Sequence, residues 1–355
     1  MSVSPGFNAT EAETLIAIAA QLEGASPPLP PPPIPSNWTM VYDSQSIGPF
    51  DNRWQLWQDT SGTGDYAAVI RGTTSQTGSI LEDLLAVMVP ASGSVTLDDV
   101  SLSYQLAADP LAGVHLGFAL GTLITLFDPA GILLNLASYV PRGHGVFIAG
   151  HSQGAAMATL CRSFLHYSTL LSDYQYSYKS YVFAQPKPGN DHYGDDYDAI
   201  AGNLGTGFTV NNNQDWVPQV PFTFELYGDL NVPNVISVLG GSPPGLAAVQ
   251  DSIASYRHHQ AQAALARQAA AFKHLAAVVR RNKLVKTQPA PAASGTSITI
   301  LPTLNFVGAG AAIALQGTPG TNPDDPKDGW WQHHAAMYYQ LLQSQLGAAA
   351  APVRR

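Results

Sequence analysis

The feature that most constrains this chain is a short turn between a buried strand and a helix. GVFIAG (residues 145–150) is a continuous apolar run, typical of a strand covered on both faces. It enters Gly150-His151-Ser152-Gln153-Gly154, and a helix is predicted from 153 to about 171. A G-x-S-x-G turn lifts the serine hydroxyl out of the sheet, and its glycines let the strand and helix approach closely. The helix N-terminus favours the oxyanion that forms when serine attacks a carbonyl. Ser152 is therefore a candidate nucleophile.

Strands and helices alternate along most of the chain. Further buried strands are predicted at 66–72, 180–186 and 208–213, with helices between them. This alternation predicts an α/β fold with a mostly parallel central sheet and helices on both faces. Apolar residues make up 45% of the 355 residues, which is ample for a large core. We therefore expect a folded α/β domain rather than a disordered chain.

Composition also excludes several classes of function and site. The chain has 16 basic and 25 acidic residues, a formal charge of −9 that argues against nucleic acid as a partner. The single Cys161 excludes an intramolecular disulfide and any multi-cysteine metal site. Residues 111–137 are apolar, but His115 and Asp128-Pro129 interrupt them, so no transmembrane span is predicted. The N-terminus lacks the basic region of a signal peptide. We expect a soluble protein, either cytoplasmic or exported by a route without a signal peptide.

The chain divides into a long α/β domain with flanking and inserted segments. We expect a helix and a proline-rich strap in 1–36, the domain in 37–345 and a flexible tail in 346–355. A helical insertion rich in alanine and basic residues spans about 246–286. It either caps the site or binds anionic surfaces, or it is a solvated outer helix.

A serine nucleophile needs a base, and the base needs an acid to orient it. On a strand–turn–helix scaffold of this kind the acid and the histidine follow the serine in the chain. Asp215 comes directly after the strand at 208–213 and is well placed to hold an imidazole, although a turn aspartate is the alternative. His333 and His334 lie where a loop enters the last predicted helix. The candidate triad is Ser152, Asp215 and one of these histidines.

Five segments, in order, carry a resemblance to a known family. AVIRGTTS (68–75) is similar to F-R-G-[ST]-x-S, VHLGF (114–118) to V-H-x-G-F, IAGHSQGAAMATL (148–160) to G-H-S-L-G-G-A-x-A, FAQPKPGN (183–190) to F-G-x-P-R-x-G-N, and NNNQDWVPQVP (211–221) to N-x-x-D-x-V-P-x-x-P. The chain thus resembles the class 3 lipases, the fungal triacylglycerol lipase type with an α/β-hydrolase fold. Gln153, Ala155 and the stretch 183–187 depart from the usual residues, but no departure removes a catalytic group.

The resemblance implies roles that spacing does not give. Thr73 matches the oxyanion residue of the family, and the N–H of Gln153 would be the second donor. Relatives place an aromatic residue three to five positions after the histidine. Tyr338 and Tyr339 stand at +4 and +5 from His334, but at +5 and +6 from His333. We therefore prefer His334 as the base, with His333 as the alternative. The chemistry needs no metal and no organic cofactor.

Two further segments invite functional hypotheses. Members of the family cover the serine with a short mobile helix, and residues 80–90 form a candidate lid, with a fixed core helix as the alternative. Its apolar positions are Leu81, Leu84, Leu85 and Met88. Four aspartates cluster with His192 in a predicted loop at 191–198. Their spacing fits no defined calcium loop, which favours an acidic surface loop.

These observations predict a serine ester hydrolase of lipase type, acting on an ester or lipid substrate at a lipid–water interface. Narrower hydrolases with the same machinery are the first alternative: a polyester depolymerase, a feruloyl esterase or a phospholipase A1. A non-enzymatic lipase-like scaffold that binds small ligands is the second alternative. The sequence leaves the oligomeric state open.

Overall fold

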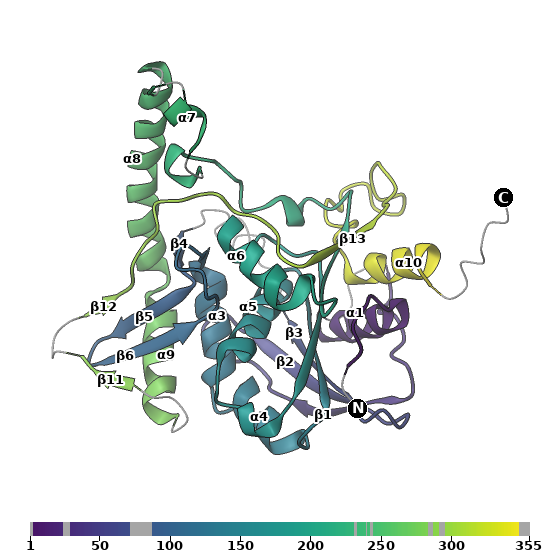
Figure 1. Cartoon of the computed structure of the whole chain (residues 1–355). Helices are drawn as coiled ribbons and strands as arrows, with labels where there is room; N and C mark the ends of the chain where they lie inside the picture. The colour runs from purple at the N-terminus through teal and green to yellow at the C-terminus, as the bar shows by residue number, and fades with distance from the viewer. Residues whose placement is uncertain are drawn as a thin grey trace.

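The structure is a computed structural model that describes residues 3–23, 29–71, 87–230, 233–238, 240–241, 244–282, 287–290 and 295–347. Its centre is a seven-stranded sheet in the order β1-β2-β3-β8-β9-β10-β13 (Figure 1). The strands are β1 (Trp38–Asp43), β2 (Arg53–Asp59), β3 (Tyr66–Arg71), β8 (Gly145–His151), β9 (Ser177–Phe183), β10 (Gly207–Asn212) and β13 (Ala311–Leu315). From β3 to β13 neighbouring strands are parallel, whereas β1 and β2 are antiparallel. This confirms the predicted α/β-hydrolase fold.

Both faces of the sheet are buried because its inner strands are apolar on both sides. All residues of β3 and of β8 are buried. Ala68, Ile70 and Ile148 belong to one core, and the alternate residues Val69 and Ala149 belong to the other. The helices that line the first core include α3 (Leu116–Phe127), α4 (Ile132–Tyr139), α5 (Gln153–Tyr167) and α9 (Ala269–Arg281). Two helices line the second, α1 (Ala9–Glu23) and α10 (Ala335–Gln345), which lie side by side in Figure 1.

The N-terminal helix α1 is tied to the sheet by charged contacts as well as by apolar packing. Nζ of Lys179, a residue of β9 that is 1% exposed, donates to Oε2 of Glu11 at 2.6 Å. The hydroxyl of Tyr181 donates to the same oxygen at 2.6 Å. At the far end of α1, Glu23 contacts His151 of β8. The predicted N-terminal helix is thus part of the core, in a layer that it shares with α10.

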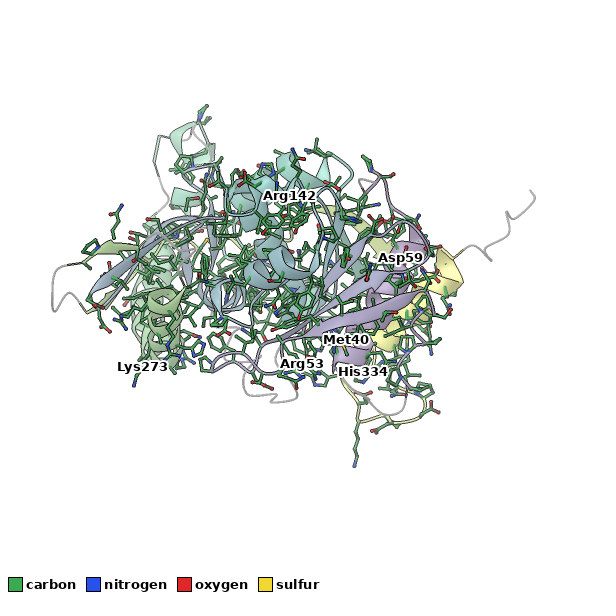
Figure 2. The ribbon with its side chains drawn as sticks, turned by 90° about the horizontal axis from the view of Figure 1, so that it is seen from below. Met40, Arg53, Asp59, Arg142, Lys273 and His334 are labelled. Carbon is green, nitrogen blue, oxygen red and sulfur yellow. The ribbon has the colours of Figure 1, made fainter. Side chains whose placement is uncertain are left out.

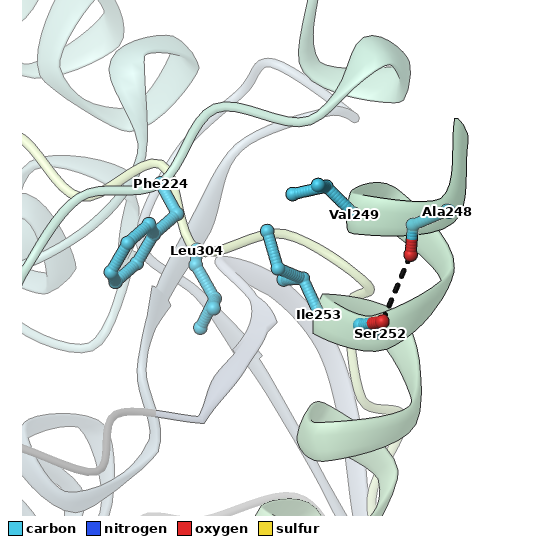
Figure 3. Close-up of a pocket in the computed structure, with 6 residues that line it drawn as sticks. All are labelled: Phe224, Ala248, Val249, Ser252, Ile253 and Leu304. Atoms are coloured by element: carbon cyan, nitrogen blue, oxygen red, sulfur yellow. Dashed lines mark hydrogen bonds between the residues drawn. The ribbon is translucent and has the colours of Figure 1, made fainter. Parts of the chain in front are cut away.

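The segment between the acid strand β10 and the last helix forms two helices with different environments. α8 (Pro244–Arg267) projects from the body together with α7 (Val235–Val238), as Figure 1 shows. α9 packs on the sheet domain and buries an apolar face. An apolar cavity of about 450 Å³ lies between α8 and the chain near Phe224 and Leu304 (Figure 3). Because α9 buries an apolar face, it is not a solvated outer helix.

Two smaller sheets complete the fold. They correct the sequence-based prediction of a lid helix that extends through Met88. One has the order β11-β6-β5-β12, and the other pairs β4 with β7. These strands are β4 (Met88–Pro90), β5 (Ser92–Leu97), β6 (Val100–Gln105), β7 (Gly113–His115), β11 (Thr287–Pro289) and β12 (Thr296–Ser297). Met88 lies in β4, is 1% exposed and pairs with His115, so it belongs to a buried strand and not to a lid helix. The predicted acidic loop at 191–198 begins instead as α6 (Asp191–Tyr197).

The long apolar segment Leu116–Tyr139 is the one stretch among the described residues with the length and hydropathy of a membrane span. Within its most apolar 18-residue window, 83% is buried inside the fold. It comprises α3 and α4, and Asp128 ends α3. Most of this segment thus packs in the hydrophobic core of the fold.

Candidate active site

The strand β8 and the helix α5 meet at a tight turn that carries Ser152. Ser152 has φ 58° and ψ −132°, a region that residues other than glycine rarely occupy. A Cβ on Gly150 would lie 2.3 Å from the carbonyl oxygen of Gly154, so the turn requires glycine there. The Ser152 N–H donates to the Phe183 carbonyl of β9 at 3.0 Å, and α5 starts at Gln153. The predicted strand–turn–helix geometry of the nucleophile is present.

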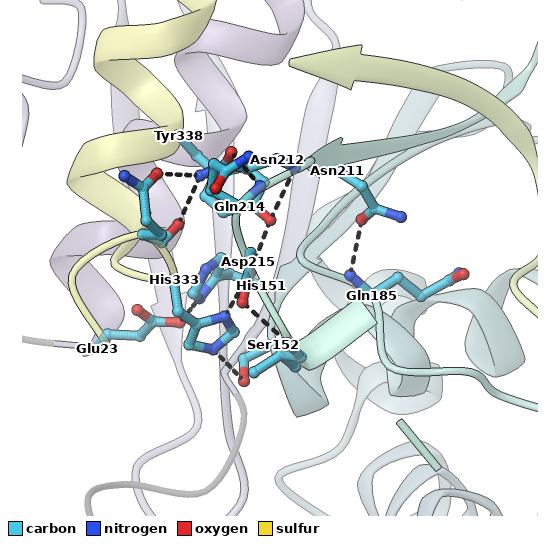
Figure 4. Close-up of polar contacts among 12 residues, drawn as sticks. Glu23, His151, Ser152, Gln185, Asn211, Asn212, Gln214, Asp215, His333 and Tyr338 are labelled. Atoms are coloured by element: carbon cyan, nitrogen blue, oxygen red, sulfur yellow. Dashed lines mark hydrogen bonds and ion pairs between the residues drawn. The ribbon is translucent and has the colours of Figure 1, made fainter. Parts of the chain in front are cut away.

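His333 connects Ser152 to Asp215 through two hydrogen bonds (Figure 4). Its Nε2 lies 2.8 Å from Oγ of Ser152. Its Nδ1 lies 2.7 Å from Oδ2 of Asp215. The Asp215 side chain is fully buried, and that of His333 is 9% exposed. Serine, imidazole and carboxylate thus form one continuous chain whose acid end is buried.

The acid is fixed by two further donors. Oδ1 of Asp215 accepts from the N–H of Val217 at 2.9 Å, and Oδ2 accepts from the Tyr338 hydroxyl at 2.8 Å. Burial would raise the pKa of Asp215, but His333 and these hydrogen bonds outweigh burial and hold its pKa below the ordinary value. Burial lowers the pKa of His333, and Asp215 offsets that effect only in part. At neutral pH the site therefore holds an ionised carboxylate and a neutral imidazole, the state in which His333 can accept a proton.

The structure corrects the choice between the paired histidines. Nε2 of His334 lies 3.0 Å from Oδ2 of Asp328 instead of contacting Ser152. In Figure 2, His334 lies on the lower edge of the molecule, well apart from Lys273 of α9. His334 is the N-cap residue of α10, while His333 precedes the helix and points back to the sheet. The preference for His334 was wrong by one residue.

Sequence reasoning missed two side chains next to the triad. Tyr338 follows His333 by five positions, and this aromatic spacing was the available signal for it. His151 is part of the G-x-S-x-G turn, but nothing in the sequence relates it to Glu23, whose Oε1 lies 2.6 Å from its Nδ1. That contact joins residues 128 positions apart. No local pattern could have indicated it.

The remaining predicted site residues have different outcomes. Thr73, Leu81, Leu84 and Leu85 lie outside the described residues, so the oxyanion role of Thr73 and the lid stay predictions. Gln153 opens α5, and its N–H role likewise stays a prediction. In the segment 191–198, Asp196 accepts from the N–H of Ala108 and from Tyr167. Among the described residues, no group of three or more histidine, cysteine or acidic side chains is arranged to hold a metal ion.

A comparison with known families identifies the part of the chain that carries this site. Residues 67–225 match the family described as Lipase (class 3). This central segment of the chain is therefore similar to the class 3 lipases. The matched lipase segment contains Ser152 and Asp215 and ends before His333. This likeness supports a lipase-type hydrolase.

Solved lipase structures show a distant likeness. A lipase from Rhizopus microsporus var. chinensis is 19% identical with a TM-score of 0.44, and the match covers 60% of this chain and 69% of that one. The Lip2 lipase from Yarrowia lipolytica is 18% identical with a TM-score of 0.46, covering 62% and 78%. The propeptide complex of Rhizomucor miehei lipase is 19% identical with a TM-score of 0.42, covering 60% and 63%. No curated protein matches this chain.

Proposed function

We propose that this protein is a serine carboxylic ester hydrolase of lipase type, with Ser152 as nucleophile, His333 as base and Asp215 as the acid that orients it. The observation that carries the proposal is the continuous pair of hydrogen bonds, 2.8 Å from Ser152 to His333 and 2.7 Å from His333 to Asp215. A serine hydroxyl reacts only when a positioned base accepts its proton. An arrangement of this kind is the recurring solution for acyl transfer.

The geometry supports a two-step reaction through an acyl-enzyme. Oγ of Ser152 attacks the ester carbonyl carbon while its proton passes to Nε2 of His333. Asp215 stabilises the imidazolium, and the N–H of Gln153 stabilises the oxyanion together with the predicted donor Thr73. The carbon–oxygen bond then breaks, and the proton on Nε2 passes to the leaving alcohol. Water repeats the sequence on the acyl-enzyme and releases the carboxylic acid and free Ser152.

The substrate class follows from the family and from the surroundings of the base. We infer esters with an apolar acyl group, acylglycerols among them. Two half-buried indoles support this inference: the Trp330 ring lies 5.5 Å from the His333 ring and 4.7 Å from the Trp216 ring. Such a pair offers apolar contact to an acyl or an alcohol moiety. The same pair also suits an aromatic acyl group, so a feruloyl ester is the second candidate substrate.

Labelling with a fluorophosphonate probe tests the nucleophile. The wild type should be labelled at Ser152 and should hydrolyse p-nitrophenyl esters, while Ser152→Ala should lose both and keep its thermal melting point. We expect the rate loss to reach several orders of magnitude, on the order of 10⁶ as for nucleophile removal in another serine hydrolase. An unlabelled wild type that binds ester without turnover would instead favour the non-enzymatic scaffold.

A substrate series separates the narrower hydrolases. We would compare p-nitrophenyl esters of increasing chain length with triglyceride emulsion, a polyester film, phosphatidylcholine and methyl ferulate. The highest kcat/KM on long-chain esters and triglyceride supports the lipase proposal. A marked preference for methyl ferulate would instead favour the second candidate.

A further inference from the structure

The last residue of the N-terminal helix brings a carboxylate next to the triad. Oε1 of Glu23 lies 2.6 Å from Nδ1 of His151, the residue that precedes Ser152 (Figure 4). The His151 side chain is 2% exposed and that of Glu23 is 25% exposed. A carboxylate–imidazole pair with so little contact with water is only weakly screened by salt.

His151 in turn contacts the proposed base. The centroids of the His151 and His333 rings are 4.7 Å apart, and the rings are tilted by 37°. The Tyr338 ring packs against the same His151 ring in a T-shaped arrangement, with the ring centroids 5.6 Å apart. Nε2 of His151 makes no hydrogen bond of normal geometry to a described residue. Glu23 is therefore the described side chain that fixes the orientation of this ring by hydrogen bonding.

Glu23 also favours the protonated form of the His151 ring. Burial would lower the pKa of His151, but the Glu23 carboxylate, with help from Asp215 and the His333 main chain, raises it above the ordinary value. Burial would raise the pKa of Glu23, and His151 reverses that effect. Among the described residues, the titratable groups that act on His333 are Asp215 after β10, His151 on β8 and Glu23 on α1. Tyr338 of α10 donates to Asp215.

We propose that Glu23 is a positioning residue for this active site: its hydrogen bond to His151 holds that ring against His333 and so supports His333 as the base directed at Ser152. A cation this close opposes protonation of a neighbouring imidazole. The repulsion from His151 outweighs the weaker attraction from Glu23 itself. The inference rests on the proposed function, because it requires His333 to act as the base.

The variant Glu23→Gln tests the proposal, since it keeps the shape and removes the charge. Without its partner, buried His151 loses its proton, and its repulsion of His333 disappears. The pKa of His333 then rises, so the acid limb of the plot of kcat/KM against pH moves to higher pH. At pH 6 we expect a loss of about threefold or more in kcat/KM. Glu23→Asp retains the charge and should retain most of the wild-type profile. An unchanged acid limb in Glu23→Gln overturns the proposal.

Glu11→Gln is the matched control because Glu11 lies on the same helix and contacts Lys179 and Tyr181 instead of the triad. It should lower the melting temperature and leave the acid limb unchanged. Equal shifts of the limb in both variants would mean that only the docking of α1 matters, which would also overturn the proposal.

A His151→Gln variant tests whether Glu23 acts on His333 through His151. In a His151→Gln protein, adding Glu23→Gln should no longer move the acid limb upward, because the cation is already absent. An upward shift of the original size in that background would show that Glu23 acts on His333 without His151.

Labelling separates this proposal from the proposed function. A wild type that no fluorophosphonate labels would refute the function itself. If the wild type is labelled and active but Glu23→Gln leaves the acid limb unchanged, only the positioning role is refuted.

Discussion

Ser152 occupies a backbone conformation that its own side chain disfavours. A non-glycine residue at φ 58° costs on the order of 1–3 kcal/mol and persists only where the surroundings hold it. Here the strand β8, the N-terminus of α5 and the Phe183 carbonyl hold it from three sides. The strained turn directs the hydroxyl toward His333, so the conformational cost is part of how the site is arranged.

Alanine variants of the paired histidines distinguish their roles. We expect His333→Ala to lose kcat by several orders of magnitude, because it removes the group 2.8 Å from Oγ of Ser152. His334→Ala should keep at least about a tenth of the activity, because it loses only a contact with Asp328. Single-turnover measurements with a p-nitrophenyl ester check both variants. The reverse order of losses would return the role of base to His334.

Asp215→Asn keeps the shape of the acid but replaces an acceptor oxygen with an N–H donor. The groups around this side chain are themselves hydrogen-bond donors. His333 can then no longer donate from Nδ1, so its neutral tautomer presents the wrong nitrogen to Ser152. A loss in kcat of about 10⁴ is the measured consequence in another triad, and we expect one of similar order here. The matched variant Asp196→Asn lies on α6, away from the triad, and should stay active. Inactivity of the Asp196 variant with a silent Asp215 variant would refute the assignment.

The register of the histidines marks the limit of residue-level prediction. Sequence reasoning placed both at the start of one helix, and α10 in fact begins at Ala335. A shift of one or two residues at a helix boundary is common, and it exchanges which of two adjacent side chains faces the sheet. Ser152 and Asp215 had no such ambiguity, because each follows a buried strand whose end is clear from its apolar run.

At the level of elements, the helices and strands marked by local sequence signals were predicted well. Contacts between residues distant in sequence were not predicted. The strand β8 and the helix α5 were predictable because the apolar run and the glycines are adjacent in sequence. The lid prediction extended a helical pattern through Met88, which instead pairs in β4 with the distant strand β7. The contact of Glu23 with His151 depends entirely on how α1 docks across the sheet.

The insertion provides a prediction at this scale. Leu275 of α9 is 0% exposed and belongs to the larger core, so Leu275→Ala should lower the free energy of unfolding by about 2–5 kcal/mol. Lys273→Ala is the control on the same helix: Lys273 is exposed, and its removal should change stability by about 0.5 kcal/mol or less. Urea unfolding followed by circular dichroism checks both. Equal midpoints would mean that α9 is only a solvated outer helix.

At the scale of the molecule, the site is assembled by the order of the strands. Neighbouring parallel strands β8, β9 and β10 deliver their carboxyl ends to one edge of the sheet, and Ser152 and Asp215 follow two of them. This is where such sheets place their ligands. The alternation of strands and helices predicted that edge, but the layer formed by α1 and α10, which brings Glu23 and His333 to it, could be seen only in the folded chain.

The distribution of carboxyl pKa values predicts a loss of stability in acid. An Arg53 hydrogen bond lowers the pKa of Asp43 to about 2. Burial would raise the pKa of several other carboxyls, but ion pairs and hydrogen bonds outweigh it and lower their pKa values; these are Glu23, Asp59, Asp215 and Asp328. Burial raises the pKa of a smaller set, Glu13, Asp65 and Asp198.

A carboxyl with a lowered folded pKa stabilises the protein above its unfolded pKa, about 3.9 for Asp, and that contribution is lost as the pH falls through the folded value. Groups with a raised pKa act in the opposite direction, because acid relieves their buried charge. The first set is larger, so the urea midpoint should fall between pH 5 and pH 3. Asp43→Asn should be less stable than the wild type at pH 7 and should lose less between about pH 4 and about pH 2. A midpoint that stays constant or rises in acid would mean that the buried, raised-pKa carboxyls dominate.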